Sequence, residues 1–179
     1  NKSKLSGSIS LARRNLFLNL VEKINEVNLS YPDDKFPPDK TIYLTLLKNT
    51  GIHTVKGGKF KIGKVNSSIK KLWDASNEFI SSASKQTKSL VEFIEVLKSA
   101  PFGLKQGLID YWVGIFLILK KDEFALYYKG QYVPNINKDN LELIYKSPKD
   151  FVIKSYDITG NKLILFNRYR DLTQLDIVK

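Results

Sequence analysis

The chain has no cysteine and only one histidine, His53. The absence of cysteine excludes disulfide bonds, thiolate metal ligands and a thiol nucleophile, and a single histidine excludes a multi-histidine metal centre. No signal peptide is recognisable, and the longest apolar run, residues 108–119, contains Asp110 and is shorter than the ~20 residues that span a bilayer. We therefore expect a cytoplasmic protein without a metal, a cofactor or a membrane partner.

Acidic residues are scarce relative to basic ones. The chain carries 29 Lys and Arg against 18 Asp and Glu, a net charge of +11 at pH 7, which is typical of proteins that bind a polyanion or an anionic membrane surface. Only Arg13, Arg14, Arg168 and Arg170 are arginines, and lysine contacts phosphates as a point charge rather than reading guanine with two bonds. This favours nucleic-acid contacts that do not depend on base sequence, although the Lys, Asn and Ile bias is also typical of an A/T-rich coding genome.

Hydrophobic residues are plentiful. They make up 42% of 179 residues, which is enough for one large domain or two small ones. The chain begins at Asn1 rather than Met and ends at Lys179 without a terminal signature, so we expect it to be part of a larger protein.

The first half of the sequence predicts helices and one hairpin. Residues 1–9 are polar and are interpreted as a linker, and an apolar helical face begins at Ser10 and ends before the proline-rich loop 31–40. The remaining elements expected here are a short helix at 41–48, a hairpin with a Gly57-Gly58 turn at 53–64, a long amphipathic helix at 69–83 and a polar connector at 81–87.

The second half has a similar order. Ser89 and Glu92 fit a capping box that opens a helix ending near Ser99. The elements expected after it are an almost wholly apolar helix at 107–120, strands at 123–129 and 131–134, a short helix at 138–146, a strand at 150–156 and a C-terminal helical extension at 158–179.

Two segments share one arrangement of a helix, a short link and a hairpin with a Lys-Gly turn. They are "TIYLTLLKNTGIHTVKGGKFKIGK" and "LIDYWVGIFLILKKDEFALYYKGQYVP". We predict an α+β, mainly helical protein with two winged-helix-like units, residues 10–86 and 87–157, each with a small β-hairpin wing.

The first predicted hairpin lies in a stretch without acids. Between Asp39 and Asp74 the sequence has no Asp or Glu, and in the hairpin Lys59 and Lys61 alternate with Phe60 and Ile62. Lysines on one face of such a ribbon can follow a phosphate backbone. The alternative is a solvated lysine face that prevents an edge strand from aggregating, and the sequence leaves both open.

Other motifs indicate little catalytic chemistry. His53 has no acidic or serine partner nearby and is interpreted as a structural hydrogen bonder, and the paired acids at 33–34 and 122–123 lie at predicted turns or ends of elements. "KGGKFKIGK" lacks the spacing of a phosphate-binding loop. Aromatic and basic residues interleave in "LYYKGQYV" and "FNRYRD", and such rings can stack on bases, although half of the first group is expected in the core.

The segment "APFGLKQGLIDYWVGIFLILKKDEFALYYKGQYVP" resembles a winged-helix region of large bacterial ATP-binding proteins of phage defence, including the BREX type. The residues that carry the resemblance are Pro101, Phe102, Gly103, Leu104, Gly107, Leu126, Gly130, Tyr132 and Pro134. "ARRNLFLNLVEK" and "TIYLTLLKNTGIH" are similar to segments upstream of that region. The resemblance implies an accessory region of a multidomain ATPase whose nucleotide site lies elsewhere.

We therefore predict a non-enzymatic nucleic-acid-binding region whose partners are duplex DNA, contacted through its backbone, and other domains of a larger chain. The predicted contact residues are Lys56, Lys59, Lys61, Lys64, Lys70, Lys71, Lys105 and Lys129. The alternative is a structural domain that docks other parts of the larger protein. A departure from a DNA-reading module is already visible, because the helix at 107–120 lacks the polar face of a recognition helix.

Overall fold

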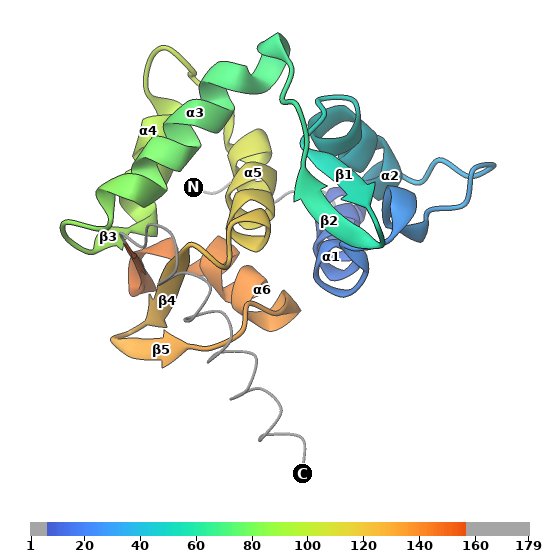
Figure 1. The fold of residues 1–179 in the computed structure, drawn as a ribbon. Coiled ribbons are helices and arrows are strands. Elements are labelled where there is room, and N and C mark those ends of the chain that lie inside the picture. Colours follow the sequence, from blue (N-terminus) through green and yellow to red (C-terminus); the bar gives the residue numbers. More distant parts are fainter. Residues whose placement is uncertain (1–6, 157–179) are drawn as a thin grey trace.

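The computed structural model describes residues 7–156 of the chain (Figure 1). Within them the fold is α+β and mainly helical, with two small antiparallel sheets, which confirms the predicted fold class. The predicted extension at 158–179 lies outside the described residues. Among the helices at 7–156, none has the length and apolar character needed to cross a membrane.

The N-terminal half ends in the predicted hairpin. Its elements are α1 (Gly7–Lys23), a 3₁₀ turn η1 (Val27–Ser30), α2 (Pro38–Tyr43), a π-helical turn η2 (Leu44–Lys48), β1 (His53–Lys56) and β2 (Lys59–Ile62). α1 begins at Gly7, so residues 7–9 are helical and are not part of a linker. α2 begins at Pro38, where the missing N–H of proline costs no hydrogen bond, and runs directly into η2.

The rest of the described chain follows the predicted order, with β3 and η3 as elements that were not predicted. Its elements are α3 (Ser67–Ser82), β3 (Lys88–Ser89), α4 (Leu90–Lys98), α5 (Gln106–Leu119), β4 (Phe124–Tyr128), β5 (Gln131–Val133), α6 (Lys138–Lys146), η3 (Pro148–Asp150) and β6 (Phe151–Ser155). The capping box that opens α4 is present, with the Ser89 side chain accepting from the backbone of α4 and Glu92 accepting from the Ser89 N–H.

The second hairpin belongs to a larger sheet. Its strand order is β3-β6-β4-β5, with Leu126 of β4 opposite Val133 of β5 on one side and opposite Ile153 of β6 on the other. β6 thus separates the short strand β3 from the hairpin, and the predicted wing is joined to the core along one edge.

α5 is the centre of the molecule. Figure 1 shows it with α3 and α4 on one side, α1 and the β1–β2 hairpin on the other, and the four-stranded sheet at one end. Residues 111–119 of α5 are all buried, as its nearly continuous apolar sequence predicts. Trp112 donates from Nε1 to Ser76 Oγ over 2.9 Å, so its one polar group is satisfied inside the core.

The two halves share one hydrophobic core. α1 packs against both α5 and α6, and its side chains Leu16, Phe17 and Leu20 are buried together with residues of α5. Gly114 permits the contact, because a Cβ atom at this position would lie 2.3 Å from the Phe17 ring. The boundary predicted near residue 86 therefore separates two parts of the chain that pack as one body.

Candidate nucleic-acid interface

The β1–β2 hairpin presents three lysines on one face. His53 lies opposite Ile62, Thr54 opposite Lys61, Val55 opposite Phe60 and Lys56 opposite Lys59. Because residues directly opposite each other share a face and successive residues alternate, Lys56, Lys59 and Lys61 point to one side with Thr54. All three are exposed. We call Lys56, Lys59 and Lys61 the lysine face.

Two glycines close the hairpin at its tip. Gly57 and Gly58 have φ values of 61° and 71°, the left-handed backbone that a two-residue turn with the twist of a hairpin requires. This turn brings Lys56 opposite Lys59, a like-charge pair that destabilises a ribbon when no anion is near. An anion bound between Lys56 and Lys59 would offset this repulsion, so the arrangement favours anion binding over the stability of the isolated hairpin.

The other face of the hairpin is fixed to the end of α1 and to α2–η2. The His53 ring stacks on Phe60 with 5.4 Å between ring centroids, and its Nε2 lies 2.8 Å from the carbonyl oxygen of Ile24. The Phe60 N–H donates to Oδ1 of Asn25 over 2.8 Å. Tyr43 contributes a hydroxyl 2.9 Å from His53 Nδ1.

These contacts define the state of His53. Nε2 must carry the proton because its partner is a carbonyl, so Nδ1 accepts from the Tyr43 hydroxyl. Burial lowers the pKa of His53, which keeps the ring neutral, and burial also raises the pKa of Tyr43 to about 12. Both ring nitrogens are thus engaged in holding the hairpin, as the structural interpretation of His53 expects.

At the base of the hairpin, two glycines allow a close contact between backbone segments. A Cβ atom on Gly51, which has a φ of 76°, would lie 2.2 Å from the carbonyl oxygen of Lys64, and one on Gly63 would lie 2.5 Å from the carbonyl oxygen of Gly51. Only glycine allows the two strands of backbone to approach this closely. Lys64 therefore leaves the hairpin at a fixed point next to the lysine face.

The lysine face has no neutralising partner within residues 7–156. None of its three lysines, nor Lys64, has a described carboxylate oxygen within 4.0 Å, whereas Lys70, Lys88, Lys98 and Lys120 each pair with one. Glu22 and Glu26 lie on or just after α1, yet neither forms a salt bridge with the hairpin in the described part of the chain. The lysines of the hairpin therefore form no ion pair within the described residues, although the segment that carries Glu22 and Glu26, at the end of α1, packs on the hairpin.

The other predicted residues have different positions. Lys70 and Lys71 lie on the first turns of α3, where Lys70 Nζ is 2.7 Å from Asp74 Oδ1 and is partly neutralised by it. Lys105 precedes α5 as its N-cap. Lys129 lies in the β4–β5 turn, on the opposite side of the molecule from the lysine face (Figure 1). The eight predicted lysines thus do not form one continuous surface.

A polar helix face beside the hairpin was not foreseen from the sequence. η2 packs against β1, and α2–η2 exposes Thr41, Thr45 and Lys48, followed by Asn49. The spacing of four and three residues is the signal that could have shown this face. α5, in contrast, is buried and cannot enter a groove, so of these two helices α2–η2 is the one with exposed polar groups.

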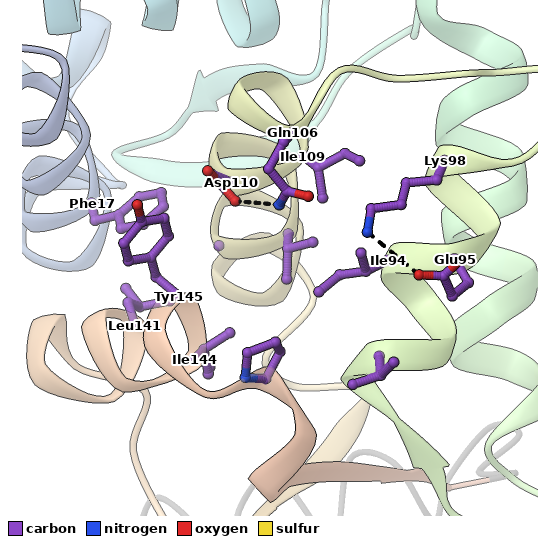
Figure 2. A pocket seen from close by; sticks show the side chains of 14 residues that line it. Phe17, Ile94, Glu95, Lys98, Gln106, Ile109, Asp110, Leu141, Ile144 and Tyr145 are labelled. Atoms are coloured by element: carbon purple, nitrogen blue, oxygen red, sulfur yellow. Dashed lines mark hydrogen bonds and ion pairs between the residues drawn. The ribbon is translucent and has the colours of Figure 1, made fainter. Parts of the chain in front are cut away.

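A hollow of about 150 Å³ lies between α4, α5 and α6, away from the hairpin (Figure 2). Its wall is mainly apolar, with Ile94, Ile109 and Ile144 facing it from three helices. The polar groups at its edge pair with each other: Gln106 donates to Asp110 over 2.7 Å, and Lys98 lies 3.4 Å from Glu95. This lining is better suited to binding an apolar side chain than to catalysing a reaction.

No metal site is present in the described part of the chain, since no group of three His, Cys, Asp or Glu side chains comes together at residues 7–156. Comparisons with protein-family models, curated proteins and solved structures found no match for the chain.

Proposed function

We propose that the chain is a non-enzymatic nucleic-acid-binding region that holds the phosphate backbone of a duplex on the lysine face of the β1–β2 hairpin. The observation that carries this proposal is the set of three exposed, unpaired lysines on one side of a ribbon whose other side is anchored. In line with the sequence resemblance, the region belongs to a larger bacterial ATPase of phage defence.

The spacing of the lysines suits a nucleic-acid backbone. Alternate residues on an antiparallel strand are about 6.8 Å apart, and neighbouring strands are about 4.8 Å apart. The phosphates of one duplex strand rise about 3.4 Å each along the helix axis, so a β2 strand lying parallel to that axis places Lys59 and Lys61 two such steps apart. Lys56 and Lys64 extend the contact to about four phosphates.

The competing explanation is that the lysines only keep a two-stranded ribbon from pairing with another chain. This explanation requires charge but no particular partner. Binding that depends on these lysines and not on equally exposed lysines elsewhere separates the two.

The proposal is tested by the affinity of a fluorescently labelled 20-base-pair duplex at low salt. Changing Lys56, Lys59, Lys61 and Lys64 together to Glu is expected to abolish binding. The matched control changes Lys85, Lys121, Lys138 and Lys149 to Glu, which alters the net charge equally at four exposed positions. Equal loss of binding in both variants would show that total charge, and not the lysine face, determines binding.

A second candidate function is docking of other domains of the larger protein. The hollow between α4, α5 and α6 continues onto the exposed side of α4, where Val91 and Val96 are each 37% exposed. Such an apolar surface is typical of an interface. This alternative predicts slower amide hydrogen exchange in α4 within the intact larger protein than in the isolated region, and equal rates would oppose it.

A further inference from the structure

The outer face of the four-stranded sheet carries three tyrosines. Tyr127 lies opposite Tyr132 of β5 and opposite Val152 of β6, and Ala125 lies opposite Lys154. Because opposite residues share a face, Tyr127, Tyr132 and Lys154 point the same way, and alternation places Tyr156 with them. We call Tyr127, Tyr132 and Tyr156 the tyrosine face.

The hydrophobic core does not require these rings. Phe124, Leu126, Phe151 and Ile153 lie on the inner face of the same strands and are buried against the helices. Tyr128, on that inner face, packs on Phe151 with 4.7 Å between ring centroids. The three tyrosines on the other face therefore add aromatic surface beyond what the fold buries.

The tyrosine face is compact and partly open. The Tyr127 and Tyr132 ring centroids lie 5.9 Å apart with an angle of 57° between the planes. Tyr132 is 52% exposed and Tyr156 is 37% exposed. Partial burial raises the pKa of Tyr156, and the nearby hydroxyls of Tyr127 and Tyr132 add to this effect, as expected when the three phenols adjoin.

Positive charge borders the tyrosine face. Lys154 is exposed on the same side of β6 as the three tyrosines, whereas the ammonium of Lys129 in the β4–β5 turn lies 5.3 Å from the ring centroid of Tyr128 on the inner face. The outward positions within the strands, Ser89, Ala125, Tyr127, Tyr132, Val152 and Lys154, include no carboxylate, and Glu123, which precedes β4 opposite Tyr156 on this side, is paired with Lys120. A partner with flat apolar groups and negative charge is complementary to this surface.

We propose that the tyrosine face binds single-stranded nucleic acid by stacking its bases, with Lys154 contacting a flanking phosphate. Aromatic side chains on a small sheet, bordered by basic groups, stack unpaired bases with little dependence on base identity. This goes beyond the duplex contact proposed for the hairpin, because it concerns another surface and a strand whose bases are exposed. It does not require the lysine face.

Tyrosines also occur in strands for structural reasons, since cross-strand aromatic pairs stabilise a hairpin. That role needs the Tyr127–Tyr132 contact but no ligand. Base stacking and hairpin stabilisation therefore differ in what they predict for a strand from which the bases have been removed.

The test measures binding of labelled 12-nucleotide single strands, (dT)₁₂ and (rU)₁₂, and an abasic strand of equal length, at low salt. Two variants accompany the parent chain. Tyr132→Phe keeps the ring, and Tyr132→Thr removes it while keeping a residue that favours strands. Circular dichroism establishes that each variant is folded. The DNA and RNA strands show which sugar the surface accepts.

The proposal predicts that the parent and Tyr132→Phe bind at least one base-bearing strand alike, and that Tyr132→Thr binds it about 5- to 150-fold more weakly. The abasic strand binds the parent at least as weakly as the base-bearing strand binds Tyr132→Thr, and duplex affinity is unchanged. The proposal is overturned if neither base-bearing strand binds, if the abasic strand binds equally well, or if Tyr132→Thr has no effect. If Tyr132→Thr does not fold, the affinities of the base-bearing and abasic strands for the parent chain still test the proposal.

Discussion

At the scale of single residues, His53 determines how the lysine face is held. It bridges Ile24 on one side and Tyr43 on the other as a neutral ring. A buried neutral histidine lowers the free energy of unfolding at low pH, because the unfolded chain binds a proton more readily than the folded chain.

Folding stability is therefore expected to depend on pH through His53. Its folded-state pKa is lowered from 6.5, so its contribution is complete above about pH 6.5 and is lost progressively as pH falls toward the folded-state pKa. Each pH unit within that window lowers the free energy of unfolding by about 1.4 kcal/mol. Urea denaturation between pH 7.5 and 5.0 measures this. His53→Gln, which keeps an N–H donor for the Ile24 carbonyl, should remove the dependence, and an unchanged dependence in that variant would assign it to other groups.

Arg13 forms the other buried polar contact of note. Its side chain is 1% exposed, its Nη2 lies 3.1 Å from Glu142 Oε1, and its guanidinium carbon lies 3.5 Å from the centre of the Tyr145 ring. The remaining nitrogens, Nε and Nη1, have no hydrogen-bond partner in the described structure. Among the described residues, Glu142 is thus the one carboxylate that pairs with Arg13, the cation that links α1 to α6.

Removing that counter-charge should destabilise the fold. Glu142→Gln keeps the size of the side chain but leaves the Arg13 charge buried, at an expected cost of about 3 kcal/mol in the free energy of unfolding. Glu22→Gln, an exposed acid on α1, is the control and should change stability by less than about 0.5 kcal/mol. Equal small effects in the two variants would mean that Arg13 is solvated or paired in another way.

At the scale of elements, the tip of the β1–β2 hairpin connects local backbone geometry with the proposed function. Gly57 takes a left-handed conformation that asparagine also adopts and that a β-branched residue does not. The lysine face exists only if this turn keeps Lys56 opposite Lys59.

Gly57→Val should therefore weaken duplex binding without altering any charge, because about 1–2 kcal/mol of backbone strain disturbs the turn. Gly57→Asn is the matched control, since Asn-Gly is a favoured sequence for this turn. Duplex affinity of the two variants, with circular dichroism to establish folding, measures the effect. Equal affinity in both would argue that the lysines act without the ordered hairpin.

The sequence predicts a helix cap or a turn correctly where the residues that determine it are adjacent in the chain. The glycine turn at 57–58 and the Ser89–Glu92 capping box need only a few adjacent residues, and both are present. The pairing of β6 with β4 depends on residues about 30 positions apart and has no local signal. The same holds for the polar face of α2–η2, whose exposure depends on what α5 and the hairpin bury.

Site prediction had the same limit. The alternation of Lys59 and Lys61 with apolar residues correctly predicts a shared face, because strand geometry has a fixed period of two. The placement of Lys129 on another sheet and the ion pair of Lys70 with Asp74 depend on the packing of whole elements. Composition alone cannot separate lysines that share a surface from lysines that do not.

At the scale of the whole molecule, one core joins the two predicted units. α1 belongs to the first unit in sequence, yet it packs on α5 and α6 of the second. Trp73 lies in α3 of the first predicted unit and Trp112 lies in α5 of the second, and neither is in α1, so their fluorescence reports on the packing of α3 and α5.

Leu16→Ala tests whether the parts unfold together. Leu16 of α1 is fully buried, and its truncation is expected to cost 2–5 kcal/mol, a rough range for buried leucines. With one core, tryptophan fluorescence and far-ultraviolet circular dichroism should show the same lowered urea midpoint. A fluorescence midpoint that stays at the parent value would mean that the tryptophan-containing part folds independently of α1.

The central claim is that the lysine face holds a phosphate backbone, and the salt dependence of duplex affinity tests it most directly. Contact with about four phosphates predicts a log-log slope of about −3 to −4 for the parent chain, since each neutralised phosphate contributes about −0.9. The variant with Lys56, Lys59, Lys61 and Lys64 changed to Glu should have a much flatter slope. No binding by the parent at low salt, or the same slope in both proteins, would contradict the claim.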